Sequence, residues 1–241
     1  MVPMDDLELA LALADEADAL TLARFRAADL RVQRKSDLTP VTEADHAVER
    51  ALRERLARER PRDAVAGEEL GVEEGDVRWW LDPIDGTKGY ARGLPVWATL
   101  IALDRRDETT CAVVSAPALG VRWWATRGGG AFRNGEAIRV SGVDRLDDAY
   151  VSTTTFRGAA RFLPLAERAY TARTYSDFWQ HVLVAEGSIE AAVEFDLNVW
   201  DWKAPKLVVE EAGGRYTAEP GLYVASNGLL YDEVRASLLP A

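Results

Sequence analysis

The chain contains few of the residues that carry the commonest enzyme chemistry. Its 241 residues include a single cysteine, Cys111, which excludes a disulfide within the chain and fits a reducing compartment. Only two histidines are present, His46 and His181, so a zinc site built from three histidines is excluded. Cys111 lies in an apolar run, and His181 follows Phe178 in a predicted helix, so we expect both side chains to pack in the interior rather than to react.

Basic residues and long apolar runs are also scarce. Lys and Arg number 29 against 40 Asp and Glu, giving a formal net charge of -11, whereas nucleic-acid-binding proteins are usually basic. No segment reaches the roughly 18 consecutive apolar residues of a membrane span, and residues 1–20 lack the basic start and apolar stretch of a signal peptide. We therefore expect a cytoplasmic protein without nucleic-acid or membrane partners. In so acidic a protein an anionic ligand requires a local positive charge, which a bound cation can supply.

The pattern of apolar residues predicts two helices followed by a run of strands. Helices are expected over residues 5–28 and 43–60, where apolar side chains recur with helical spacing. Thr42 followed by Asp45 resembles a capping box at the start of the second helix. Asn134-Gly135 is a strong hairpin signal. The strands expected in this part of the chain are 64–67, 77–81, 97–103, 111–116 and 122–126.

The remainder of the chain alternates between strands and helices. This order favours layered helices and sheets over a plain doubly wound sheet. No linker separates independent domains, so we predict one domain over residues 1–241, with lobes at approximately 1–145 and 146–241. The elements expected here are a strand at 149–154, a helix at 162–172, a helix capped by Ser176-Asp177, a strand at 190–195 and a final helix at 202–212.

The segment Asp82-Pro83-Ile84-Asp85-Gly86-Thr87 follows an apolar run. Pro83 biases the preceding residue toward an extended backbone, so we expect a strand to end at Asp82. The two carboxylates and the Ile84 carbonyl can then converge on one point, and such oxygen ligands suit Mg²⁺. Gly86 lets the backbone approach a ligand closely, and a helix beginning next would offer free N–H groups to a phosphate. Alone, the segment is equally typical of a surface turn.

Three other segments place acidic residues at the ends of predicted elements. Glu68 and Glu69 follow a strand, a position where sheet proteins often build their sites. Asp201 precedes the last helix, where it can serve as an N-cap. Asp45 lies in the first turn of the second helix, where an acid interacts favourably with the helix dipole. Taken singly, each segment has this purely structural explanation.

Taken together, the four segments resemble the inositol monophosphatase family, in its order and approximate spacing over nearly the whole chain. The resemblance implies an α+β fold, a layered α/β/α/β/α sandwich. It further implies a homodimer and Mg²⁺-dependent hydrolysis of a small phosphate monoester, with two or three Mg²⁺ ions per site. It rests on Asp82-Pro83-Ile84-Asp85-Gly86-Thr87, Trp200-Asp201, Gly67-Glu68-Glu69 and Thr39-Pro40-Val41-Thr42-Glu43-Ala44-Asp45.

The same resemblance implies roles for individual residues. Asp45 and Thr87 correspond to the pair that orients and helps to deprotonate the attacking water, and Glu68 helps to hold that water. Glu69 would reach a further metal ion through water, and the backbone of Gly86 and Thr87 would contact the phosphate. The implied metal ligands are Glu68, Asp82, the Ile84 carbonyl, Asp85 and Asp201.

Three more segments, 95–103, 114–120 and 176–181, resemble the histidinol-phosphate phosphatases of this family. That implies histidinol phosphate as the substrate and a role in histidine biosynthesis. Glu194 and Asn198 lie where the family contacts the organic part of its substrate, and a carboxylate would suit the substrate's ammonium and imidazole. Both residues can also be read as a strand end and an exposed loop.

Three alternatives stay open from the sequence. The first is an inositol-1-monophosphatase or a broad-specificity sugar-phosphate phosphatase with the same metal chemistry. The second is a phosphatase for 3′-phosphoadenosine compounds, although no basic cluster for a second phosphate is evident. The third is a binding protein that retains the fold without the activity, which the full set of carboxylates disfavours.

Overall fold

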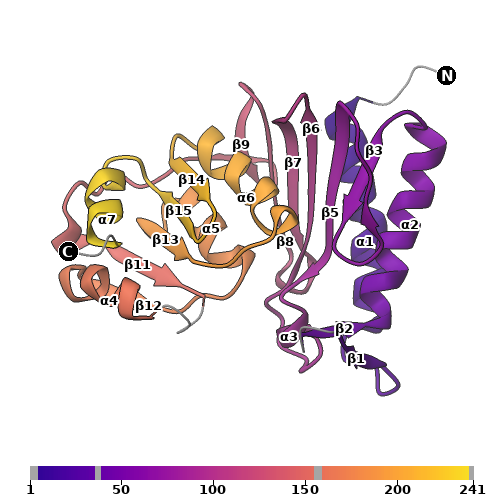
Figure 1. The fold of residues 1–241 in the computed structure, drawn as a ribbon, viewed down its shortest axis with the longest axis horizontal. Helices are drawn as coiled ribbons and strands as arrows, with labels where there is room; N and C mark the ends of the chain where they lie inside the picture. The colour runs from indigo at the N-terminus through magenta and orange to yellow at the C-terminus, as the bar shows by residue number, and fades with distance from the viewer. Residues whose placement is uncertain (1–4, 36–38, 155–158, 239–241) are drawn as a thin grey trace.

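Two β-sheets alternate with three groups of helices along the long axis of the molecule (Figure 1). The computed structural model describes residues 5–35, 39–154 and 159–238. One pair of helices covers the outer face of the larger sheet, a second pair lies between the sheets, and a third covers the smaller sheet. The layered α/β/α/β/α sandwich implied by the family resemblance is therefore confirmed.

The first pair of helices packs on the larger sheet through small and medium apolar side chains. Leu13 and Leu52, one from each helix, share an apolar cluster with Trp79 and Leu81 of the sheet. Each helix begins with a capping box, which satisfies amide groups that the first turn leaves without helical partners. The capping box predicted from the sequence at the second helix is confirmed. The two helices are α1 (Asp6–Arg24) and α2 (Glu43–Glu59).

The larger sheet contains eight strands within the described residues. They are β3 (Ala64–Gly67), β4 (Gly71–Val72), β5 (Val77–Asp85), β6 (Ala98–Arg105), β7 (Glu108–Ala116), β8 (Val121–Thr126), β9 (Gly130–Arg133) and β10 (Glu136–Ile138). Their spatial order is β10-β9-β8-β7-β6-β5-β3-β4. Among the described strands of this sheet, only β3 and β5 pair in parallel, with Gly67 opposite Leu81. The residues that follow Gly67 and Leu81 therefore emerge at the same edge of the sheet.

The central pair of helices fills the space between the two sheets. Phe178 and Leu207, one from each helix, pack with Trp123 of the larger sheet and Ala225 of the smaller sheet. Figure 1 shows this pair in orange between the sheets. The pair consists of α5 (Phe178–Ala185) and α6 (Val199–Glu211).

An ion pair fastens α6 to the larger sheet close to one of the predicted ligands. Lys203 Nζ lies 2.5 Å from Asp104 Oδ2 on β6, and the ammonium also lies over the rings of Trp80 and Trp202. Trp80 Nε1 donates to the same carboxylate at 2.8 Å. Because Lys203 follows Asp201 by two residues, this contact helps to hold the start of α6 on the sheet.

The smaller sheet has five strands within the described residues, and the last pair of helices covers its outer face. The strands are β11 (Tyr150–Thr153), β12 (Thr171–Arg173), β13 (Ala191–Glu194), β14 (Arg215–Glu219) and β15 (Leu222–Ser226), in the spatial order β12-β11-β13-β15-β14. The helices are α4 (Ala159–Arg168) and α7 (Tyr231–Leu238). Leu165 and Val234 pack with Val151 and Val193 of the sheet.

Short elements complete the chain. A two-stranded ribbon precedes α2, and a four-residue helix follows β5. Asn134 and Gly135 form the turn between β9 and β10 with positive φ angles of 49° and 91°, as the hairpin signal predicts. No helix in the described ranges combines the length and apolarity that crossing a membrane requires. The short elements are β1 (Val32–Arg34), β2 (Pro40–Thr42), α3 (Thr87–Tyr90), and the 3₁₀ turns η1 (Pro117–Leu119) and η2 (Leu146–Asp148).

The predicted end of a strand at Asp82 is wrong, because β5 continues to Asp85. The register against β6 shifts between these two residues. The irregularity accommodates Pro83, which has no N–H to give to a ladder. Thr99 Oγ1 donates to the Pro83 carbonyl at 2.8 Å and so gives that group a side-chain partner.

The predicted start of the last helix is also wrong. α6 begins at Val199 and its N-cap is Asn198, so Asp201 occupies the third helical position instead of the cap. Its carboxylate accepts a hydrogen bond from the backbone N–H of Asn198 at 2.7 Å, which completes a capping box. Nor is α6 the last helix, since α7 follows two further strands. Pro205 lies inside α6, although proline is better tolerated in the first turn of a helix.

Two other helix ends differ from the predicted ones. α1 stops at Arg24 rather than at residue 28, and Arg26 has a positive φ of 61°. α4 stops at Arg168, and residues 171–173 form an edge strand beside β11 instead of the expected last helical turn. In both cases apolar residues continue with helical spacing beyond the observed end of the helix, so the sequence pattern predicts a longer helix than the backbone forms.

Candidate active site

The turn after β5 is shaped by a glycine in a left-handed conformation. Gly86 has φ 92° and forms the N-cap of α3. A Cβ at this position would lie 3.0 Å from the Val96 carbonyl oxygen, so both the backbone angle and the space require glycine. A short helix, α3, does begin at Thr87. This turn brings the Thr87 hydroxyl to 2.9 Å from the Ile84 carbonyl oxygen, to which it donates a hydrogen bond.

Three carboxylates meet next to this turn. Asp82, Asp85 and Asp201 each offer an oxygen, and these oxygens all lie within 4.8 Å of one another. Two of the residues come from the end of β5, and Asp201 comes from the first turn of α6. The structure therefore brings together residues that are more than a hundred positions apart in the sequence. This group of three carboxylates can hold a metal ion, and its oxygen donors suit Mg²⁺.

Backbone amide groups orient the same three carboxylates. Asp82 Oδ1 accepts the Ile84 N–H at 3.0 Å, and Asp85 Oδ2 accepts the Phe178 N–H at 2.6 Å. Asp201 Oδ2 accepts the Asn198 N–H at 2.7 Å. Each carboxylate is thus held through one oxygen and keeps the second for another ligand. The contact between Asp85 and Phe178 also connects β5 directly to the start of α5.

Burial and mutual repulsion make this group strongly basic. Burial raises the pKa of Asp82 and Asp85 well above the usual range, and the neighbouring carboxylates raise it further. Burial likewise raises the pKa of Asp201 to about 7, with Glu68 and Asp177 adding to the shift. Several negative charges that are forced together out of water favour a cation, since it offsets their repulsion. The residues present therefore fit the metal ion that the resemblance implies.

Asp45 and Thr87, the predicted pair, do lie together. Thr87 Oγ1 is 3.3 Å from Asp45 Oδ1. The other oxygen, Asp45 Oδ2, accepts the Thr42 N–H at 2.8 Å and the Thr42 hydroxyl at 2.5 Å. Burial raises the pKa of Asp45, while the hydrogen bonds from Thr42 oppose the shift. One carboxylate therefore both caps α2 and faces the hydroxyl that borders the metal group.

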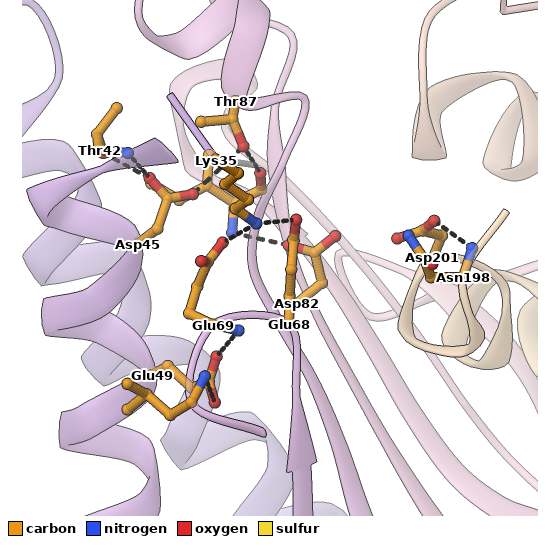
Figure 2. Close-up of polar contacts among 12 residues, drawn as sticks. Lys35, Thr42, Asp45, Glu49, Glu68, Glu69, Asp82, Thr87, Asn198 and Asp201 are labelled. Atoms are coloured by element: carbon orange, nitrogen blue, oxygen red, sulfur yellow. Dashed lines mark hydrogen bonds and ion pairs between the residues drawn. The ribbon is translucent and has the colours of Figure 1, made fainter. Parts of the chain in front are cut away.

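Glu68 and Glu69 share a lysine that the sequence interpretation did not include. Lys35 Nζ lies 2.6 Å from Glu68 Oε1 and 2.6 Å from Glu69 Oε1. Figure 2 shows this ammonium group between the two carboxylates. Burial raises the pKa of Glu69 to about 7, although Lys35 opposes the shift. A cation thus already occupies the space between two acidic side chains at the edge of the site.

Asp177 is a second residue that the sequence interpretation treated only as a helix cap. It precedes α5 with φ 53° and ψ -138°, and its side chain makes no capping hydrogen bond. A strained backbone of this kind costs on the order of 1–3 kcal/mol and is found mainly at functional sites. Its Oδ2 lies 3.4 Å from the position that a Cβ of Gly86 would occupy. Burial raises the pKa of Asp177, while Lys88 opposes the shift.

The two predicted substrate-binding residues differ in exposure. Glu194, at the end of β13, has only 3% of its surface exposed, and its Oε1 accepts a hydrogen bond from Gln180 Nε2. Burial raises its pKa to about 7, and the charge of Asp177 contributes. Asn198 is exposed and forms the N-cap of α6. Both residues lie on the connection that leads into Asp201.

The residues set aside from the sequence do pack in the interior. Burial lowers the pKa of His181 to about 3, and its ring lies 5.5 Å from that of Tyr216. Burial raises the pKa of Cys111 to about 12. Neither is poised to act as a base or nucleophile near neutral pH.

Comparison with known proteins agrees with this geometry. The model of the inositol monophosphatase family matches residues 4–236. A protein of Mycobacterium tuberculosis named histidinol-phosphatase is 48% identical, over 97% of this chain and 98% of its own length. One of the same name from Streptomyces coelicolor is 47% identical, over 96% of each chain. The solved structure of an IMPase from Thermotoga maritima has a TM-score of 0.91 and 31% identity, covering 98% of this chain and 97% of that one.

A fourth comparison extends the agreement to another structure. An inositol monophosphatase from Zymomonas mobilis has a TM-score of 0.86 and 30% identity, covering 98% of each chain. The family model spans nearly the whole described structure, and the relatives match over nearly their full length. The chain therefore belongs to the inositol monophosphatase family.

Proposed function

We propose that this protein is a Mg²⁺-dependent histidinol-phosphate phosphatase, which converts L-histidinol phosphate and water to L-histidinol and phosphate in histidine biosynthesis. The observation that carries the proposal is the convergence of Asp82, Asp85 and Asp201, in a chain that is 48% identical to a protein named histidinol-phosphatase. An inositol-1-monophosphatase or a broad sugar-phosphate phosphatase is the second candidate, because more distant relatives carry inositol monophosphatase names.

The proposed metal ligands are the carboxylates of Glu68, Asp82, Asp85 and Asp201 with the carbonyl of Ile84. Two or three Mg²⁺ ions would lower the pKa of bound water and offset the charge of the phosphate. Glu69 is proposed to act on a further ion through water. In support, backbone amides fix one oxygen of each of the three aspartates and leave the other available.

Asp45 and Thr87 are proposed to handle the proton of the attacking water. The Thr87 hydroxyl can accept a hydrogen bond from that water while it donates to the Ile84 carbonyl or to Asp45. The oxygen of the water forms a bond to phosphorus as the ester bond between phosphorus and the histidinol oxygen breaks. The proton that the attacking water loses passes by way of Thr87 to Asp45, and the leaving oxygen takes up a proton from solvent water to give the alcohol. The backbone N–H groups of Gly86 and Thr87 would bind the phosphate, since they start a helix beside the carboxylates.

The choice of substrate rests on charge. Histidinol phosphate carries an ammonium and an imidazole, whereas inositol phosphate offers only hydroxyl groups beyond its phosphate. Asp177 and Glu194 place two carboxylates on the α5 and β13 side of the site. We propose that these acids favour a cationic substrate and that Asn198 adds a hydrogen bond. The charge of Asp177 also raises the pKa of Glu194, so the two carboxylates act on each other electrostatically.

The test is phosphate release from histidinol phosphate and from inositol 1-phosphate, measured with and without Mg²⁺. We expect release to require the metal and kcat/KM to favour histidinol phosphate by at least about tenfold, which equals 1.4 kcal/mol. Preference for inositol 1-phosphate by the same margin would establish the second candidate. Release that is independent of divalent cations would overturn the metal-dependent mechanism.

We further propose that the active protein is a homodimer and that residues 1–145 and 146–241 act as lobes of one domain. Light scattering during gel filtration tests the first part, and a single cooperative unfolding transition tests the second. A monomeric active enzyme or two separate transitions would contradict these proposals.

A further inference from the structure

We propose that Glu49 is a positioning residue, whose buried carboxylate fixes the backbone of the turn that carries Glu68 and Glu69. Glu49 lies in the middle of α2, outside every acidic segment that the sequence pointed to. The role rests on the proposed metal-dependent function, because it concerns how two of the acidic side chains are presented to the metal.

The contacts of Glu49 are directed at the backbone of this turn. Its Oε2 accepts the Glu69 N–H at 2.7 Å, and its Oε1 accepts the Leu70 N–H at 3.1 Å. Figure 2 shows the Glu49 carboxylate on α2 reaching toward the turn below Glu69. The side chain has none of its surface exposed. Two successive amide groups held by the two oxygens of one carboxylate fix the orientation of the intervening peptide.

The turn leaves room for this carboxylate because its first residue is glycine. A Cβ on Gly67 would lie 2.1 Å from Glu49 Oε1, well inside van der Waals contact. On its other side, the turn is tied to β5, since the Glu68 N–H donates to the Leu81 carbonyl at 3.2 Å. Leu81 directly precedes Asp82. The turn is therefore held between α2 and the strand that carries the metal ligands.

Arg53 gives the Glu49 carboxylate a charged partner in this buried position. Its Nε lies 2.8 Å from Glu49 Oε1, and its side chain is 16% exposed. The guanidinium also contacts the Val65 and Gly71 carbonyls on either side of the turn. A buried carboxylate without such partners would be strongly destabilising. With Arg53 and two amide groups, Glu49 can act as a fixed anchor next to a site that is already crowded with negative charge.

A carboxylate elsewhere in the chain makes the same kind of contact without a site nearby. Glu211, at the end of α6, accepts the Gly128 N–H at 3.0 Å through one oxygen and the Gly130 N–H at 3.1 Å through the other. Its guanidinium partner is Arg127, at 3.6 Å. The turn between β8 and β9 that Glu211 holds contains none of the proposed ligands. Glu211 therefore provides a matched control for the effect of losing such an anchor.

The experiment compares Glu49→Gln with Glu211→Gln in the full-length protein. Mg²⁺ affinity is measured by calorimetry without substrate, and the Mg²⁺-induced rise in Tm and kcat at saturating Mg²⁺ are measured alongside. We expect Glu49→Gln to weaken Mg²⁺ binding about tenfold, as is typical when a group that orients metal ligands is lost. Its kcat at saturating Mg²⁺ should change much less. Glu211→Gln should lower the Tm of the metal-free protein and leave Mg²⁺ affinity unchanged.

Gly67→Ala is a second variant, which perturbs the Glu49 carboxylate from the turn instead of from α2. The three atoms nearest to the added methyl group all belong to the Glu49 carboxylate, so we expect the carboxylate to be displaced without loss of the fold. Its Mg²⁺ affinity should fall as in Glu49→Gln. A wild-type affinity in folded Gly67→Ala or Glu49→Gln, or an equal loss in Glu211→Gln, would overturn the positioning role alone. Wild-type protein that binds no Mg²⁺ would overturn the proposed function as well.

Discussion

The two sides of the site differ in how their side chains are held. On the side of the larger sheet, Asp82 and Asp45 are fixed by short hydrogen bonds from residues next to them in the sequence. On the side of the central helices, Asp177 and Glu194 are held by the fold, through a strained backbone and through Gln180. The two acids named on the first side are thus oriented by local motifs, and the two on the second side by long-range packing. The chemistry of a phosphatase can thus stay constant on one side while the substrate is selected on the other.

The largest expected effect comes from removing a ligand on the side of the larger sheet. Asp85→Asn should lower phosphate release more than about a hundredfold, because even groups that only orient ligands are worth 10- to 100-fold. The fold should remain, since an amide oxygen can still accept the Phe178 N–H. Phosphate release with saturating Mg²⁺ and far-UV circular dichroism check the two parts. Wild-type turnover would remove Asp85 from the site.

A change on the side of the central helices should alter selectivity rather than chemistry. Asp177→Asn should lower kcat/KM for histidinol phosphate about 10- to 100-fold, in line with the 1.5–3 kcal/mol of a hydrogen bond to a charged group. Asparagine tolerates the positive φ at this position, so the backbone should be preserved. Turnover of inositol 1-phosphate serves as the control and should change little. An equal loss for both substrates would show that Asp177 serves the chemistry common to both.

The stability of the metal-free protein should depend on pH because of the raised carboxyl pKa values. Glu69 and Asp201 have pKa values of about 7 when folded, against about 4 for ordinary carboxyl groups. Between these values the folded chain binds more protons than the unfolded chain, so its stability falls as pH rises from 5 to 8. Thermal melts should show this fall, and Mg²⁺ should reduce it. A metal-free Tm that rises over this range would contradict the assigned shifts.

The smallest expected effect comes from removing a helix cap, and it should differ between the capping boxes of α1 and α2. Thr42→Ala should destabilise the protein by about 1 kcal/mol through loss of a helix cap and should also lower activity, because Asp45 loses its hydroxyl partner. Asp5→Ala removes the equivalent cap from α1, where no site residue is involved, and should lower only stability. Urea unfolding and phosphate release measure the two quantities. Equal activities in both variants would show that Thr42 does not contribute to the site.

Site residues that belong to distinctive local motifs could be predicted from the sequence, and residues that reach the site only through tertiary contacts could not. Glu68, Asp82, Asp85 and Asp201 stand next to glycine, proline or tryptophan in segments with a characteristic order, so their types and spacing were informative. Lys35 and Glu49 carry no such signal, because a lysine before a loop and a glutamate in a helix are ordinary surface residues. Their contacts depend on how β1 and α2 lie against the turn at Gly67.

Element boundaries near the site show the same limit. Proline favours an extended residue before it and fits the first turn of a helix better than its interior. For these reasons β5 is expected to end at Asp82, and α6 to begin later than it does. Both prolines, Pro83 and Pro205, are instead accommodated within elements, at an irregular register and inside a helix. Asp177 was recognised as a cap, but the sequence does not indicate its positive φ or the hydrogen bond that its N–H donates to Thr154 Oγ1, 23 residues away.

The position of Asp201 couples metal binding to the integrity of the whole molecule. Asp82 and Asp85 belong to one sheet layer and Asp201 to the helical layer beside it, so an ion shared by the three would cross-link separate layers. Removing that ion would leave like charges facing each other across the junction. Proteases should therefore find the metal-depleted chain easier to cut, and the first cuts should fall where the two layers separate.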